Sequence, residues 1–168
     1  MQWGDGFRAL VLYDADDPGQ AKRAGALTLA DFGVDEGLSG SKRVPELLAW
    51  TATAPEETPV PEGTPEAMPP APDTWHPKRL GFSGLPKPEA AAAVLAKAYD
   101  LVVNLQPRAF PPFDYLAASA SAHLRAVGHE EADALRDGAP VYDIVIRAQP
   151  GRFLPELRAY LRALNPTQ

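Results

Sequence analysis

The stretch AAAAVLAKAYDLVVNLQ, residues 90–106, decides the fold. Its first part, Ala90–Ala98, is rich in alanine, the residue with the highest helix propensity, and follows Pro88 and Glu89, which favour a helix start. Its second part, Tyr99–Leu105, is an almost continuous apolar run, typical of a strand that is covered on both faces. A helix followed at once by such a strand is the repeating unit of an α/β sheet.

Further strand and helix patterns alternate on both sides of this stretch. Short apolar runs predict strands, and apolar residues spaced three or four positions apart predict helices. The predicted strands are Arg8–Tyr13, Val44–Thr51, Arg79–Phe82, Tyr99–Leu105, His123–Gly128 and Val141–Ile146. The predicted helices are Gln20–Asp31 with a cap at Asp16 or Asp17 and a stop at Gly33, Pro88–Ala98, a helix from Pro111 with apolar spacing to Leu124, and Arg152–Leu164.

This alternation predicts one α/β domain over residues 1–168. Strand–helix–strand order implies right-handed crossovers and a parallel or mostly parallel sheet. We therefore expect a three-layer sandwich, in which a Rossmann-like sheet of roughly five or six strands has helices on both faces. Pro45 restricts the second strand to a sheet edge or places the proline at the start of the strand.

A proline-rich segment, residues 54–77, interrupts the pattern. Eight of the 19 prolines lie here, together with several acidic residues and no Lys or Arg. Proline donates no backbone hydrogen bond, and the segment has little apolar surface to offset the entropy lost on ordering. It is predicted to be an extended surface insertion. An alternative is that it binds a protein partner through Met68 and Trp75.

Composition excludes several classes of protein. The 16 Lys and Arg against 22 Asp and Glu give a net charge of −6, which argues against nucleic-acid and membrane partners. The absence of Cys excludes disulfides and thiolate metal sites, and the three His have no metal-ligand spacing, so no metal or cofactor is expected. No apolar run reaches the roughly 18 residues of a membrane helix, and no secretory signal is evident, so we expect a cytoplasmic location.

Polar residues that follow the predicted strands are the candidate ligand-binding residues. In open α/β sheets, ligands bind beyond the carboxyl ends of the strands. Asp14 and Asp16 follow the first strand, Asn104 ends the strand of the central stretch, and Arg108 comes shortly after it. His129 follows the strand His123–Gly128.

The first strand and its two acids, Leu10–Asp16, resemble the opening motif of haloacid-dehalogenase-type phosphatases. That resemblance implies that Asp14 attacks phosphorus and that Asp16 handles the proton of the leaving group beside Mg²⁺. Asp17 and Pro18 depart from the residues that normally follow this motif, and no later acidic pair completes a metal site. The other interpretation is a polar strand end with a helix cap. Glycine-rich phosphate loops and a nucleophile elbow are missing, since Gly81–Leu85 does not match Gly-x-Ser-x-Gly.

Two family resemblances concern the second half of the chain. Tyr99–Gln106, a helix rich in Ala and Ser, and Arg125–Gly128 resemble the sheet core of heptosyltransferase-like glycosyltransferases. The longer pattern from Leu80–Gly84 to Val141–Ile146 is similar to a small uncharacterised bacterial family of α/β proteins. Both resemblances imply a fold, and neither transfers a catalytic residue, because a shared sheet does not carry a shared reaction.

Three functions therefore stay open. The first is a soluble, non-catalytic module that binds or regulates a protein partner, with the proline-rich segment as a contact surface. The second is a small-molecule-binding or degenerate glycosyltransferase-like domain that uses the strand ends. The third is a phosphatase-like enzyme built on Asp14 and Asp16. The oligomeric state cannot be read from the residues.

Overall fold

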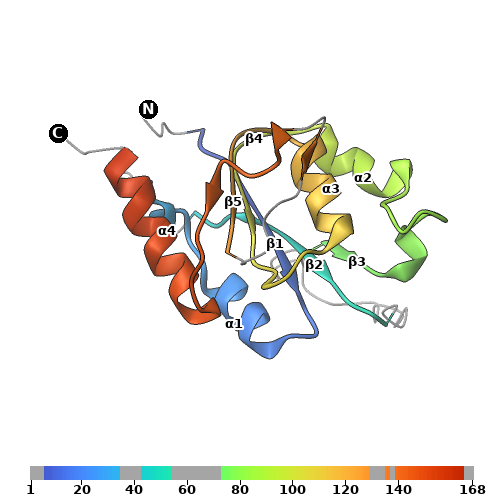
Figure 1. Cartoon of the computed structure of the whole chain (residues 1–168), viewed down its shortest axis with the longest axis horizontal. Helices are drawn as coiled ribbons and strands as arrows, with labels where there is room; N and C mark the ends of the chain where they lie inside the picture. Colours follow the sequence, from blue (N-terminus) through green and yellow to red (C-terminus); the bar gives the residue numbers. More distant parts are fainter. Residues whose placement is uncertain (1–5, 35–42, 54–72, 129–134, 137–138, 165–168) are drawn as a thin grey trace, which may run out of the picture.

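A computed structural model describes residues 6–34, 43–53, 73–128, 135–136 and 139–164 of the chain. Its centre is a sheet of six strands in the order β3-β2-β1-β4-β5-β8, and every neighbouring pair is parallel (Figure 1). The strands of this sheet are β1 Ala9–Asp14, β2 Glu46–Trp50, β3 Asp73–Trp75, β4 Ala98–Asn104, β5 Ser121–Val127 and β8 Ile144–Val145. The predicted parallel α/β sheet is confirmed.

Helices cover both faces of this sheet. The α-helices are α1 Pro18–Ala26, α2 Pro88–Leu95, α3 Pro111–Ser119 and α4 Pro150–Leu164, and the 3-10 helices are η1 Leu29–Phe32 and η2 Pro77–Arg79. In Figure 1, α1 and α4 lie on one side of the sheet and α2 and α3 on the other. A separate antiparallel pair, β6 Leu135–Arg136 and β7 Ala139–Pro140, lies outside the sheet.

Each face of the sheet has its own apolar core, because successive side chains of a strand point to opposite faces. Val11 and Val103 pack with the side chains of α1, η1 and α4. Leu12 and Val102 pack with those of α2 and α3. All four side chains are fully buried. The continuous apolar runs of β1 and β4 are therefore explained by helices on both faces, and the three-layer sandwich is confirmed.

One predicted strand is wrong. The segment Arg79–Phe82 starts with the last residue of the 3-10 helix η2 and enters a tight loop. Among the described residues, its only ladder contact is an isolated antiparallel bridge between Leu80 and Pro86. Gly84 has a φ of 75°. A left-handed residue of this kind favours a turn over an extended strand.

Three helices are shorter than predicted. α2 ends at Leu95 and not at Ala98, because Ala98 already begins β4. α1 ends at Ala26, because Leu27 is extended and the separate 3-10 helix η1 begins after it. Gly33, with φ 81°, ends η1 and not α1. Likewise α3 ends at Ser119, so the apolar spacing that continues to Leu124 belongs to the next strand, β5. For α1 and α3, the helical spacing of apolar residues continues beyond the point where the backbone leaves the helix. The spacing alone therefore does not predict where these helices end.

The carboxyl end of the proline-rich segment also differs from expectation. Residues 54–72, including Met68, lie outside the described residues. Asp73–Trp75, however, forms the edge strand β3, which pairs with β2, and the side chain of Trp75 is fully buried. Trp75 is therefore a core residue, and its predicted role as a contact for a partner is wrong. Pro45 lies just before β2, at a strand start as expected.

Membrane-spanning helices can be assessed for the described residues. None of the helices in this part of the chain is both long and apolar enough to cross a bilayer.

Candidate functional site

The strand order creates a switch point between β1 and β4. From β1 the chain builds outward through β2 and β3, and it then returns to place β4 on the other side of β1. Ligands of open α/β sheets bind at the carboxyl ends of the two strands that flank such a point. Leu12 is paired with Asn104 in the register, so Asp14 and Asn104 both lie near this edge.

Asp14 and Asp16 lie together at this edge, but their carboxylates accept hydrogen bonds from neighbouring groups of the protein. One carboxylate oxygen of Asp14 accepts a hydrogen bond from the backbone N–H of Asp16, at 2.9 Å. The carboxylate of Asp16 accepts hydrogen bonds from the Thr51 hydroxyl at 2.8 Å and the Ala52 N–H at 2.7 Å. Asp16 therefore joins the loops after β1 and β2. Among the described residues, no group of three His, Cys, Asp or Glu could hold a metal ion.

Asp17 caps the helix α1. Its carboxylate accepts hydrogen bonds from the N–H groups of Gly19 at 2.9 Å and Gln20 at 3.2 Å. These bonds favour the charged form and lower the pKa of Asp17. The buried side chain of Gln20 completes the corner, because its Oε1 accepts from the Asp14 N–H at 2.9 Å and its amide donates to Asp17 at 3.3 Å. The alternative interpretation of this stretch as a strand end with a helix cap is confirmed.

Asn104 is part of a buried polar network. Its Nδ2 donates to the hydroxyl of Tyr142 at 2.8 Å, and its Oδ1 accepts from the Gln106 N–H at 3.0 Å. The Tyr142 hydroxyl donates to Asp114 of α3 at 2.6 Å. Burial raises the pKa of Tyr142, which keeps the phenol protonated as this donor. Asn104 therefore connects β4 to α3 and to the segment before β8.

Two predicted residues remain. Arg108 is exposed in the loop between β4 and α3, and His129 lies outside the described residues. Sequence reasoning missed Tyr142, the partner of Asn104, and Asp114, which accepts the hydrogen bond of Tyr142. The three residues come from different elements of the chain, and no local spacing indicates that they meet.

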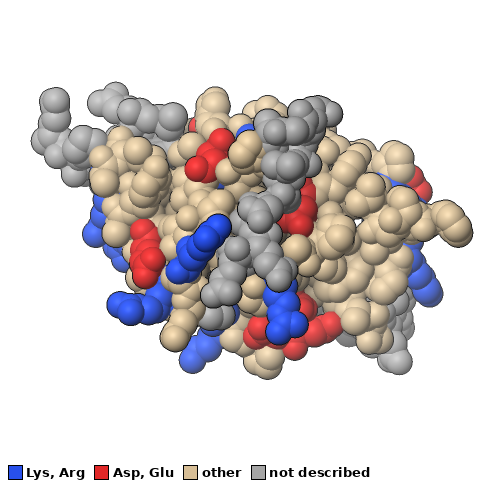
Figure 2. Space-filling model, in the orientation of Figure 1, with Lys and Arg blue, Asp and Glu red and all other residues tan. Residues whose placement is uncertain are grey.

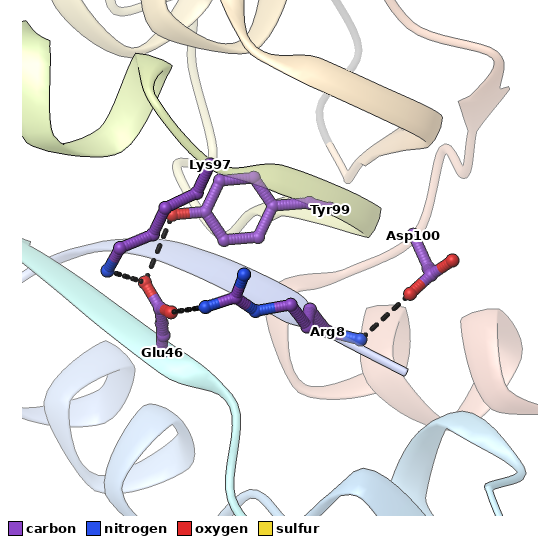
Figure 3. A network of polar contacts seen from close by, with 5 residues as sticks. All are labelled: Arg8, Glu46, Lys97, Tyr99 and Asp100. Atoms are coloured by element: carbon purple, nitrogen blue, oxygen red, sulfur yellow. Dashed lines mark hydrogen bonds and ion pairs between the residues drawn. The ribbon is translucent and has the colours of Figure 1, made fainter. Parts of the chain in front are cut away.

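A second polar cluster lies at the opposite, amino edge of the sheet (Figure 3). The carboxylate of Glu46 lies 2.9 Å from the Lys97 ammonium, 3.0 Å from the Tyr99 hydroxyl and 3.5 Å from the Arg8 guanidinium. Asp100 accepts a hydrogen bond from the backbone N–H of Arg8 at 2.9 Å. Burial and the charge of Glu46 raise the pKa of Tyr99. These charges bond one another and hold the starts of β1, β2 and β4 together.

The loop between η2 and α2 presents a very exposed aromatic side chain. The relative exposure of Phe82 is 112%, the highest among the exposed large apolar residues described. The loop itself is closed by backbone hydrogen bonds, from the Gly81 N–H to the Leu85 carbonyl at 2.8 Å and from the Gly84 N–H to the Gly81 carbonyl at 3.0 Å. A further bond, from the Lys87 N–H to the Arg79 carbonyl at 2.9 Å, closes its base.

Basic side chains lie at the base of this loop. Lys78 and Arg79 are exposed in η2, and Lys87 precedes α2. In Figure 1 the loop projects at the right end of the molecule, and in Figure 2 blue side chains lie just below this apolar tip. We name residues 80–86 the Phe82 loop. Sequence reasoning missed it as an exposed surface.

Comparisons with known proteins identify a family and no characterised relative. A model described as "Family of unknown function (DUF6913)" matches residues 66–164. No curated protein and no solved structure matches the chain. The predicted likeness to an uncharacterised family is therefore confirmed. Its bacterial origin and the likeness to heptosyltransferase-like glycosyltransferases stay predictions.

Proposed function

Because the chain belongs to DUF6913, a family of unknown function, we propose its role from its own geometry: it is a non-catalytic module that binds a protein partner through the Phe82 loop. The observation that carries this proposal is the exposure of Phe82, at 112%, on a loop closed by backbone hydrogen bonds. An aromatic side chain presented in this way is available as a contact for a partner.

The polar groups at the carboxyl edge support a non-catalytic role. The hydrogen bonds of these groups go to other parts of the protein. Asp16 bonds Thr51 and Ala52, and Asn104 bonds Tyr142 and Gln106. These groups hold the loops and the helix α3 in place.

The Phe82 loop has the properties of a binding anchor. Moving a phenylalanine side chain from water into an apolar pocket contributes about 1.5–3 kcal/mol. A tip already fixed by the bonds of Gly81 and Gly84 loses little conformational entropy when it binds. Interfaces are enriched in aromatic residues, and a few such residues supply most of the binding energy.

The surroundings of Phe82 indicate the chemistry of the partner. Lys78, Arg79 and Lys87 lie around the base of the loop, so a complementary site is an apolar pocket with acidic side chains at its rim. A protein pocket fits better than a membrane, because the net charge of −6 repels anionic lipid and a single aromatic residue gives weak membrane attachment.

Peptide display on the purified chain tests this proposal. Peptides are selected on the wild type and counter-selected on the variant Phe82→Ala, with Phe82→Trp as the matched aromatic control. We expect enriched peptides that combine an apolar residue with Asp or Glu, that bind Phe82→Trp, and that bind Phe82→Ala at least about tenfold more weakly.

Three outcomes would overturn the proposal. In the first, no peptide survives counter-selection. In the second, the selected peptides bind Phe82→Ala as tightly as the wild type. In the third, the wild type but not Phe82→Ala sediments with vesicles of anionic phospholipid, which would identify a lipid surface as the target.

A partner contact in the proline-rich segment is a separate proposal. Its test replaces residues 55–72 with a Gly/Ser linker of the same length and stops before β3, since Trp75 belongs to the core and the parallel strands β2 and β3 need a long connection. We expect the replacement to leave the melting temperature almost unchanged and to remove binding to a partner identified with the full chain. Unfolding of the replacement variant would show that the side chains of the segment stabilise the fold.

A further inference from the structure

A groove lies between α1, η1 and α4, on the face of the sheet away from α2 and α3. Its volume is about 500 Å³, within the range of small-molecule sites. Its apolar floor consists of Leu27, Phe32 and Leu154. In Figure 1 these three elements lie at the left of the molecule, at the opposite end from the Phe82 loop.

Three arginines line this groove: Arg23 from α1, and Arg158 and Arg162 from α4. On the face shown in Figure 2, blue side chains gather over the α4 side of the molecule. Asp31 is the acidic residue in the lining, and its Oδ1 lies 3.7 Å from Arg158. The groove is therefore locally positive in a chain whose net charge is −6.

The single carboxylate in the lining already has other partners. The Oδ2 atom of Asp31 accepts hydrogen bonds from the N–H of Thr28 at 2.9 Å and from its hydroxyl at 3.2 Å, which hold the start of η1. The positive charge of Arg23 lies near Asp17 and, together with the stronger effect of the Gln20 N–H, lowers the pKa of that carboxyl group. For Arg162, no acidic partner lies among the described residues.

Arg158 has unused hydrogen-bonding capacity. Its side chain is 41% exposed, and its Nη1 lies 3.7 Å from Asp31, whereas its Nε atom is enclosed by protein and does not face the groove. A guanidinium presents its donors in a planar fork that matches the two oxygens of a carboxylate.

We infer that this groove binds a small monocarboxylate with an aliphatic body. The carboxylate would accept hydrogen bonds from Arg158 and lie near Arg162, and the aliphatic body would cover Leu27, Phe32 and Leu154. The apolar floor distinguishes such a ligand from an inorganic anion, and the arginines distinguish it from a neutral apolar molecule. This inference is independent of the Phe82 loop, so a failure of one leaves the other standing.

Titration with octanoate tests the inference, with binding followed by isothermal calorimetry and by amide chemical shifts. Octan-1-ol and inorganic phosphate are the two matched probes, since each lacks one half of the ligand. We expect octanoate to bind at least about tenfold more tightly than either probe. The shifted amides should belong to α1, η1 and α4.

Substitutions in α4 locate the site. Arg158→Gln should weaken octanoate binding by about tenfold, whereas Arg152→Gln, an exposed arginine on the same helix that does not line the groove, should leave it unchanged. Ala159→Trp should block binding without removing a charge, because Ala159 is an exposed residue in the lining. Melting curves of all three variants check that they fold.

Several results would overturn the inference. Octanoate that does not bind, or that shifts amides elsewhere, removes the site. Phosphate that binds as tightly as octanoate shows a general attraction of anions, and octan-1-ol that binds as tightly shows that the arginines have no role. If Arg158→Gln and Arg152→Gln lose octanoate affinity equally, Arg158 has no specific role in the groove.

Discussion

Trp75 and Phe82 lie seven positions apart in the chain, yet they differ as much in exposure as two aromatic residues can. The Trp75 side chain is fully buried between the edge of the sheet and the core of the α2–α3 face, whereas Phe82 is 112% exposed. The 3-10 helix η2 and the base of the Phe82 loop separate them. The comparison shows that one short segment can contribute one aromatic residue to the core and present another to solvent.

The two residues also differ in how the backbone holds them. Trp75 is in strand register with Trp50 of β2, and its carbonyl accepts a hydrogen bond from the Thr51 N–H at 2.9 Å. Phe82 lies in a loop that bonds mainly to itself through Gly81 and Gly84. Removing the Trp75 side chain should therefore destabilise the whole fold, whereas removing the Phe82 side chain should change only the surface of the protein.

The largest predicted effect is on Trp75. Trp75→Ala should reduce the free energy of unfolding by about 3–5 kcal/mol, because it leaves a large cavity in the core. Trp75→Phe should cost less, since it keeps most of the volume and removes an indole N–H that has no hydrogen-bond partner within the described part of the chain. Urea denaturation measures both values. A loss below about 1 kcal/mol for Trp75→Ala would contradict its place in the core.

A smaller effect is predicted for Tyr142. It tests whether the polar side chains at the carboxyl edge of the sheet stabilise the fold, as Trp75 does, or contribute little to stability, as expected for Phe82. Tyr142→Phe removes the hydroxyl that joins Asn104 to Asp114 and leaves both without this bond. We expect a loss of about 1–3 kcal/mol in the free energy of unfolding. If denaturation curves show no loss, this edge is not held by the network and could be free to bind a ligand.

The next effect concerns the cap at Asp17 and depends on pH. The pKa of Asp17 is lower in the folded chain than its ordinary value of 3.8, so its contribution to stability is complete above that pH and is lost as the pH falls toward the lowered value. Asp17→Ala should cost about 1 kcal/mol at neutral pH.

Asp17→Asn is the matched variant, because asparagine caps a helix without titrating. It should keep most of the stability at neutral pH and reduce the loss in acid relative to the wild type. Melting temperatures measured across the acidic range compare the three chains. An unchanged acid profile in Asp17→Asn would show that other carboxyl groups set it.

Much of the fold could be predicted from the sequence, because the decisive signals are local. The apolar runs of β1 and β4, the alanines of α2 and the cap at Asp17 each act within a few residues. The strand β3 could not be predicted in this way. Its three residues follow many prolines, and Trp75 becomes a core residue only because β2 presents an open edge for pairing.

The candidate site was less accessible to sequence reasoning. Asp14, Asp16 and Asn104 do lie at the predicted carboxyl edge, but their partners Thr51 and Tyr142 come from other segments of the chain. Whether a carboxylate is available for chemistry or already bonded depends on those partners. The exposure of Phe82 is likewise a property of the folded loop, since the same side chain in a strand would have been half-buried.

The most direct test of the central claim combines two measurements on Phe82→Ala: its free energy of unfolding and its affinity for peptides selected on the wild type. We expect the unfolding free energy to stay within about 0.5 kcal/mol of the wild type and the peptide affinity to fall at least about tenfold. A loss of stability above about 1 kcal/mol, or peptide binding equal to that of the wild type, would contradict the claim that Phe82 serves recognition and not folding.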